Sequence, residues 1–217
     1  MSEMYNETII NDTKEMVRGK LLNEGTGHDW YHIERVWKTA VTLAEKEKAN
    51  RFIVELAALL HDLIDDKLVS NKDEAVQEVM YWLEGVGVTS KDSERILEII
   101  ETISFKGGNS KKLHTLEAQI VQDADRLDAI GAIGIARCFA YAGSKGDPLF
   151  DPELSVREKM TEEEYRKGKS SAVHHFYEKL LKLKDLMNTG AAREMAEERH
   201  AFMEDYLTHF FNEWEGQ

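Results

Sequence analysis

The sequence predicts an all-α fold, and three observations support that prediction. Apolar residues recur at spacings of three and four along most of the 217-residue chain, which is the helical period. The strict alternation of apolar and polar residues that marks half-buried strands is nearly absent. Proline, which interrupts helices, occurs only at positions 148 and 152. A chain of this length is typical of one domain, so we expect a single-domain helical bundle over residues 1–217.

The first half of the chain is expected to form five helices. Asp29 has the side chain of an N-cap and stands before the second of them. The third, RFIVELAALLHDLID, is apolar nearly all round, which predicts a central and buried helix. Gly85 and Gly87 end the fourth, and polar residues 106–112 follow the fifth. The apolar positions place these helices at 9–17, 29–44, 51–65, 75–83 and 93–104.

The second half is predicted to hold three helices. Residues 115–141 form one long apolar helix with acidic residues set into it. Residues 143–156 contain both prolines and two glycines, which indicates a loop. Two helices follow at 158–188 and 191–214. Aromatic residues recur at helical spacing along the last of these, and we interpret that stripe as core packing.

The charge balance argues against a nucleic-acid-binding protein. Lys plus Arg is 28 and Asp plus Glu is 41, a net charge of −13 that repels a phosphate backbone. The single cysteine, Cys138, permits no internal disulfide, which fits a reducing compartment. The N-terminal residues do not resemble a signal peptide, and the densest apolar stretch, 129–136, is too short for a membrane span. We therefore expect a cytoplasmic protein without nucleic-acid or membrane partners.

Polar residues stand where the helical pattern demands apolar ones. His61 and Asp62 end the most hydrophobic helix, Asp125 lies in the apolar segment QIVQDADRLDAI, and His32 lies in the first turn of its helix. Each alone has an ordinary structural explanation, as a satisfied histidine or a buried ion pair. Together they supply a mixed nitrogen and oxygen set, which suits Mn, Fe, Co, Ni or Zn better than Ca. A bound ion would offset the cost of burying them.

The ordered set His32, His61-Asp62 and Asp125 resembles the H…HD…D signature of the HD-domain metal-dependent phosphohydrolases. The segments HDWYHIERV, VELAALLHDLIDDK and VQDADRLDAIGAIGIAR resemble a small bacterial subgroup that includes nucleotide pyrophosphohydrolases. The resemblance implies a metal-binding core over 26–142 with helices 158–214 packed on it. It also implies that the four residues hold one divalent ion (Mn, Fe, Co, Ni, Zn or Mg). That ion would activate a water toward the phosphorus of a small phosphorylated substrate, a nucleotide in our interpretation.

Further residues are candidates for catalysis and for substrate binding. Family members place the last ligand in an AD-x-L segment, here residues 124–127, which favours Asp125 over its neighbours Asp123 and Asp128. Either Asp65 or Asp66 could assist the attacking water, and the resemblance favours Asp65. One helical turn before His32, His28 is a candidate for a contact with substrate or water. The candidate phosphate ligands are Lys67, Lys106, Arg126 and a basic stripe of His175, Lys179 and Lys182.

Other readings of the same residues remain open. The enzyme could be a 5′-nucleotidase that releases inorganic phosphate. The chain could instead sense a nucleotide through a retained but inactive metal site, although the presence of all four ligands argues against a degenerate site. A purely structural helical protein would have no use for a buried His-Asp doublet. The basic stripe, too, has an alternative role in pairing with Glu178.

Overall fold

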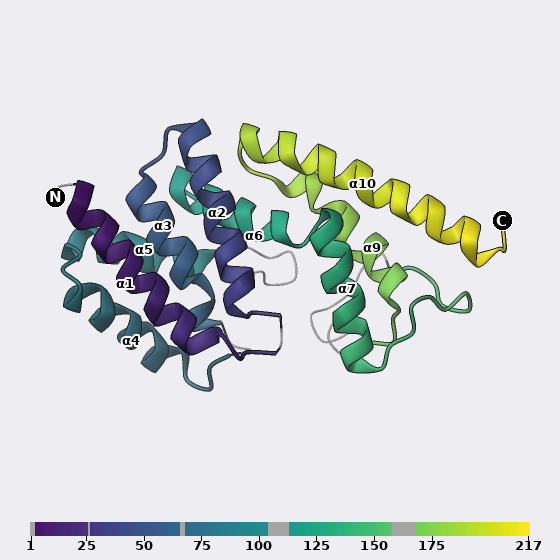
Figure 1. The fold of residues 1–217 in the computed structure, drawn as a ribbon, viewed down its shortest axis with the longest axis horizontal. Coiled ribbons are helices and arrows are strands. Elements are labelled where there is room, and N and C mark those ends of the chain that lie inside the picture. Colours follow the sequence, from purple (N-terminus) through teal and green to yellow (C-terminus); the bar gives the residue numbers. More distant parts are fainter. Residues whose placement is uncertain (1–2, 26, 66–67, 104–112, 158–167) are drawn as a thin grey trace. The chain divides into compact units, whose positions relative to one another are not determined.

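The computed structural model describes residues 3–25, 27–65, 68–103, 113–157 and 168–217 (Figure 1). Within these ranges every regular element is helical, so the predicted all-α class is confirmed. The chain forms two compact units, residues 1–124 and 125–217, and the expectation of a single domain stays a prediction. None of the described helices is long and apolar enough to cross a membrane.

The described elements follow one another along the chain in two groups. The first unit contains α1 (Glu3–Leu21), α2 (Trp30–Glu47), α3 (Arg51–Leu60), the 3₁₀ helix η1 (His61–Ile64), α4 (Lys72–Gly85) and α5 (Ser90–Thr102). Helix α6 (Leu116–Asp128) begins in the first unit and ends in the second. The second unit continues with α7 (Gly131–Lys145), α9 (Ala172–Glu178), η2 (Leu180–Lys182), η3 (Lys184–Leu186) and α10 (Gly190–Trp214).

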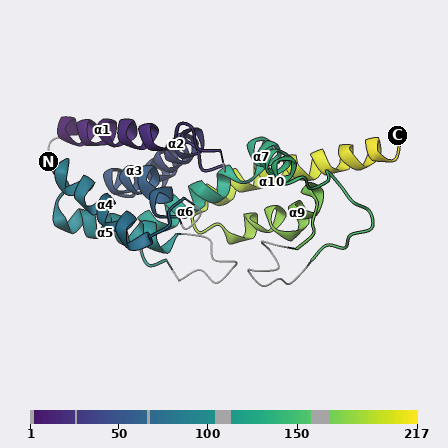
Figure 2. The ribbon, with the colours of Figure 1, turned by 90° about the horizontal axis from the view of Figure 1, so that it is seen from below.

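Helix α3 is the centre of the first unit, as its composition predicts. It packs against α1, α2 and α5, and Figure 2 shows it between α1 on one side and α4 and α5 on the other. Ile53, Leu56 and Leu59 are fully buried, and each such side chain contributes about 1.5–3 kcal/mol to folding. The one acid on this helix, Glu55, is also buried, and the Arg51 guanidinium and the Trp37 indole donate hydrogen bonds to it.

The ends of α2 and α3 set the positions of the later site residues. Asp29 is the N-cap of α2, because its carboxylate accepts a hydrogen bond from the His32 amide at 2.8 Å, which confirms the prediction. The α-helix expected over 51–65 stops at Leu60, and the chain continues as η1. Such tightening is common at helix ends, where carbonyls lack α-helical partners.

The long helix predicted over 115–141 is two helices. The break falls at Ala129 and Ile130, between α6 and α7, and Ile130 has extended backbone. Gly131 follows with a φ of 75°, a conformation that L side chains disfavour. A Cβ at this position would lie 2.9 Å from the Cγ of Arg199. The apolar periodicity continues across the break, which is why it did not reveal the two helices.

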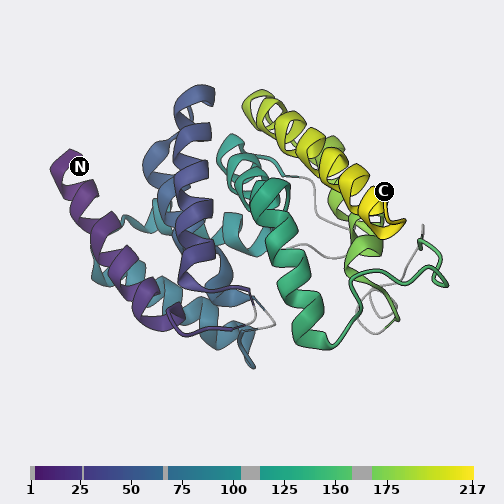
Figure 3. The same ribbon diagram turned by 45° about the vertical axis from the view of Figure 1, so that its right-hand side comes forward.

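Aromatic packing holds the second unit together. Phe139 on α7, Phe176 on α9 and Tyr206 and Phe210 on α10 form a connected cluster, with ring centroids 6.0 to 6.4 Å apart. Figure 3 shows α7 and α10 side by side in this unit. Tyr206 and Phe210 of the α10 stripe therefore pack as predicted, whereas Phe202 and Trp214 of the same stripe are exposed.

The helix predicted over 158–188 is also interrupted. Residues 158–167 lie outside the described ranges. After them, α9 spans only Ala172–Glu178, and Lys179 leaves the helical region with φ −137° and ψ −58°. Glu178 is buried, and its two carboxylate oxygens accept hydrogen bonds from Arg157, each at 2.7 Å. That contact ties the end of α9 to the preceding loop.

Stability in acid should depend on His175. Burial first, and then the charge of Lys179, lower the pKa of His175 to about 4, against about 6.5 in an unfolded chain. Between these values the unfolded chain binds a proton that the folded chain does not, so stability falls as pH decreases through this window. In urea unfolding, His175→Gln should reduce the slope of stability against pH by up to about 1.4 kcal/mol per pH unit. His209→Gln, at a side chain that is 70% exposed on α10, should leave the slope unchanged. Parallel curves for wild type and His175→Gln would contradict the prediction.

Candidate metal centre

The site is built around the doublet at the junction of α3 and η1. His61 and Asp62 are buried, at 7% and 5% exposure. The Nδ1 of His61 lies 2.8 Å from the carbonyl oxygen of Ala58. A carbonyl only accepts hydrogen bonds, so Nδ1 must carry the proton and donate. In the neutral ring, Nε2 then presents an unprotonated lone pair.

That lone pair faces an acceptor. The Nε2 of His61 is 3.3 Å from Oδ1 of Asp62. Among the described residues, it is also a buried atom without a hydrogen-bond partner. Two lone pairs so close together repel each other unless a positive charge lies between or beside them. The charge can be a second proton on His61 or a metal ion, and the backbone-oriented ring is the usual arrangement of a metal-binding histidine.

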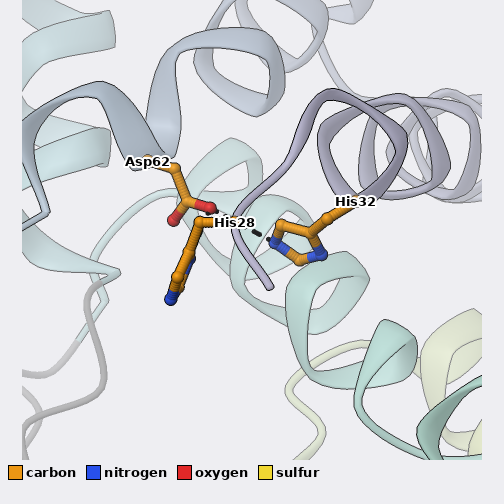
Figure 4. Close-up of side chains that lie close together, drawn as sticks. All are labelled: His28, His32 and Asp62. Carbon is orange, nitrogen blue, oxygen red and sulfur yellow. Dashed lines mark hydrogen bonds and ion pairs between the residues drawn. The ribbon is translucent and has the colours of Figure 1, made fainter. Parts of the chain in front are cut away.

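Two further histidines approach the same carboxylate from α2 and the residues before it. Because Asp29 starts α2, His28 precedes the helix and His32 lies in its first turn. The Nδ1 of His28 is 2.7 Å from Oδ2 of Asp62, and the Nε2 of His32 is 3.4 Å from the same oxygen. Figure 4 shows the His32 ring directed at the Asp62 carboxylate and His28 beside that carboxylate. The rings of His32 and His61 are also in contact, with centroids 5.4 Å apart.

The histidines determine the charge of Asp62. Burial by itself would raise the pKa of this carboxyl. The charge of His61 and the hydrogen bonds from His28 and His32 outweigh burial and hold the pKa of Asp62 well below its usual range. Asp62 is therefore a carboxylate at neutral pH, in the form that binds a cation.

The donor set fits a divalent transition metal. One ligating atom each from His28, His32 and Asp62 lies within 4.8 Å of the others, and a nitrogen of His61 lies within that distance of one on His32. Imidazole nitrogens with a carboxylate oxygen suit Mn, Fe, Co, Ni or Zn. The unpartnered Nε2 of His61 is the observation that best supports this fit, since an ion would satisfy it.

The three aspartates of α6 have different surroundings. Asp128 is buried and pairs with Arg137, whose Nη1 lies 2.5 Å from its Oδ2. Asp123 is fully buried. Asp125 is half-buried and stands in the last turn of the helix, in the second unit. The ion pair of Asp128 weakens its case as an alternative ligand, and Asp125 stays the predicted one.

Asp65 lies one 3₁₀ turn beyond Asp62. Its amide donates a hydrogen bond to the Asp62 carbonyl at 3.0 Å, and its own backbone is extended, which ends η1. Side chains three apart on a 3₁₀ helix lie on one face, so this spacing agrees with a role beside Asp62. The other candidates near the doublet and in the polar loop, Asp66, Lys67 and Lys106, lie outside the described residues.

The predicted basic stripe does not exist as one helical face. His175 is on α9, Lys179 follows its end and Lys182 is exposed in η2, so the spacing of four and seven residues does not align them. With a pKa of about 4, His175 is also neutral at pH 7. Glu178 forms its ion pair with Arg157, and its charge also acts on His175.

The remaining phosphate candidates have distinct partners. Arg126 donates a hydrogen bond to the backbone carbonyl of Leu186. Burial lowers the pKa of Lys179, while the neighbouring Asp125 works against that shift. The structure thus places the Lys179 amine near the predicted ligand Asp125, within the second unit.

Sequence reasoning missed two contacts that orient the doublet. One is the Ala58 carbonyl that fixes the ring of His61, and the other is the bond from His28 to Asp62. The first leaves no side-chain signal, because any residue at position 58 supplies a carbonyl. The second depends on how α2 packs on α3, which spacing along the chain does not encode.

The comparisons with known proteins agree on one family. The HD domain matches residues 29–130. Bacillus subtilis YpgQ, described as uncharacterized, is 47% identical over 88% of this chain and 86% of its own length. A crystal structure of YpgQ in complex with ADP superposes with a TM-score of 0.77 at 43% identity, covering 94% of this chain and 97% of the other.

A second solved relative extends this likeness over the whole length. The HD-superfamily hydrolase from Bacillus thuringiensis is 44% identical, with a TM-score of 0.80, and the match covers 98% of this chain and 100% of the relative. The matched HD-domain region includes His32, the His61-Asp62 doublet and Asp125. On this evidence the chain belongs to the HD domain family.

Proposed function

We propose that this protein is a metal-dependent phosphohydrolase that acts on a small nucleotide. The observation that carries the proposal is the buried Nε2 of His61, which has no hydrogen-bond partner and faces the Asp62 carboxylate. A purely structural core would pay about 1–3 kcal/mol for such an unsatisfied group. Two facts about relatives support the reaction class and the substrate: one is described as an HD-superfamily hydrolase, and YpgQ was crystallised with ADP.

The proposed ligands are His32, His61, Asp62 and Asp125, with the metal one of Mn, Fe, Co, Ni, Zn or Mg. When bound, such an ion supplies Lewis acidity toward a water molecule and a phosphate oxygen. The protein's own contribution is orientation and proton transfer. His28 holds the Asp62 carboxylate in place through the 2.7 Å contact at Oδ2. Asp65 is proposed to accept the proton of the attacking water.

A nucleotide substrate needs positive charge on a protein that carries −13. The metal supplies part of it, and Lys179 is the protein cation that we propose for the phosphates. The two reaction types within the proposal differ in product: a pyrophosphohydrolase releases pyrophosphate from a triphosphate, and a 5′-nucleotidase releases phosphate from a monophosphate. A panel of nucleoside mono-, di- and triphosphates with both products measured separates them. A nucleotide sensor would bind a nucleotide but release neither phosphate nor pyrophosphate.

Replacement of His61 should abolish metal binding. His61→Ala removes the unpartnered nitrogen, so Mn²⁺ affinity measured by titration calorimetry should fall at least about 100-fold, the upper range for altered metal sites. The helical signal in circular dichroism should largely persist. His209→Ala, an exposed histidine on α10, is the matched control and should bind as wild type does. Retained Mn²⁺ affinity in His61→Ala would place the metal elsewhere.

Replacement of Asp65 should affect turnover more than metal affinity. Asp65→Asn keeps the size of the side chain and removes the base, so kcat should fall about 10²-fold, the lower end for acid–base catalysis. The Mn²⁺ dissociation constant should change little. Asp205→Asn, at an exposed aspartate of α10, is the control. An unchanged kcat would transfer the role to Asp66 or leave the metal alone to activate the water.

Replacement of Lys179 and replacement of Lys182 should have different effects on KM. Lys179→Met removes the cation beside Asp125, so KM for a triphosphate should rise about tenfold, as expected for one lost charge-assisted contact, and KM for a monophosphate should rise less. Lys182→Met alters an exposed position of η2 and should leave both KM values unchanged. If the two variants behave alike, the assignment of Lys179 is wrong.

A further inference from the structure

The last turn of α6 needs outside support. A helix leaves its final carbonyls without N–H partners, and an unsupported last turn frays. Asp125 lies in that turn, because α6 ends at Asp128. The chain then bends at Ile130 and Gly131 and starts α7, so α6 has no continuing helix to hold it.

Arg199 supplies part of that support from α10. Its guanidinium donates a hydrogen bond to the carbonyl oxygen of Leu127. Its aliphatic stem lies over the bend, since a Cβ added to Gly131 would come within 2.9 Å of the Arg199 Cγ. One side chain therefore contacts both the end of α6 and the residue that turns the chain away from it.

Two more arginines hold the same turn. Arg137 on α7 donates to Oδ2 of Asp128 at 2.5 Å and approaches the Asp128 carbonyl at 3.4 Å. Arg126, in the turn itself, donates to the Leu186 carbonyl in η3. Arginine suits this work because its fork of donors can engage carbonyl and carboxylate oxygens in fixed directions. The turn is thus anchored to α7, η3 and α10, all within the second unit.

We propose that Arg199 and Arg137 are positioning residues that hold the Asp125 carboxylate ready to bind the metal. The inference rests on the proposed function, in which Asp125 is a ligand. A ligand on a fraying turn is competent for only part of the time, and the apparent dissociation constant rises by the inverse of that fraction. Loss of Arg199 therefore weakens metal binding through the backbone of α6, without the removal of a ligand atom.

The chain offers a matched control for this idea. Arg193 is also on α10, and it too donates to backbone carbonyls, those of Met187 and Asn188, at 3.2 and 3.0 Å. Arg193→Met should cost stability in the same way as Arg199→Met. The bonds of Arg193 go to residues 187 and 188, whereas Arg199 bonds to α6. The comparison separates general destabilisation of α10 from an effect on the last turn of α6.

The experiment measures Mn²⁺ affinity of the full-length, metal-free protein by titration calorimetry, with the melting temperature of the same samples. Arg199→Met should raise the dissociation constant about tenfold, the lower end for residues that orient metal ligands. Arg193→Met should stay within about twofold of wild type. Arg199→Lys keeps one donor and should recover part of the affinity. If Arg199→Met is too unstable to purify, Arg137→Lys gives the same test through Asp128.

The outcomes are distinct. Unchanged Mn²⁺ affinity in Arg199→Met, or equal weakening in Arg193→Met at an equal loss of melting temperature, overturns the positioning role alone. A wild-type protein that binds Mn²⁺ only with the His61→Ala affinity overturns the proposed metal site, and this inference with it.

Discussion

The rest of the site depends on one constraint, the buried contact between the lone pairs of the His61 Nε2 and an Asp62 carboxylate oxygen. The Ala58 carbonyl fixes the proton on Nδ1 of His61, which leaves Nε2 against an Asp62 oxygen at 3.3 Å. That arrangement costs free energy unless a second proton on His61 or a metal ion supplies positive charge. It persists because α3 is anchored along its length by side chains that are fully buried, including Leu56, Leu59 and Leu60. The most apolar of the described helices thus holds the His61-Asp62 doublet in place.

Helix ends position each of the proposed ligands. His32 lies in the first turn of α2, directly after the Asp29 cap, and His61 and Asp62 lie where α3 tightens into η1. Asp125 lies in the last turn of α6, where arginines bind the free carbonyls. A helix end brings the side chain and the orphan backbone groups to one place, so a capping contact also orients a ligand. The contacts that stabilise each helix end therefore also orient the proposed ligands.

The sequence predicted most of the helices and the buried His61-Asp62 doublet. It did not predict the points at which the backbone leaves a helix and changes direction. Apolar periodicity located α3 and α10, and the Asp29 side chain marked the start of α2. The same periodicity ran through the break at Ile130 and past the end of α9 at Glu178, because buried residues continue at helical spacing on both sides. The predicted basic stripe of His175, Lys179 and Lys182 required one continuous helix, and α9 ends at Glu178. The orientation of His61 was not readable either, because it depends on a backbone carbonyl.

The arginines and Lys179 of the second unit have different surroundings, and the difference bears on the proposed phosphate binding. In the second unit, Arg137 and Arg157 pair with buried carboxylates, and Arg126 and Arg199 donate to carbonyls. Their rigid forks suit such fixed contacts, and each contact holds an element near the end of α6 or α9. A lysine amine is a compact charge on a flexible stem, which adapts to a ligand that comes and goes. Burial makes the charge of Lys179 costly, as its lowered pKa records. In the proposed function an arriving phosphate would lower that cost, so that substrate binding and the charged state of Lys179 would favour each other.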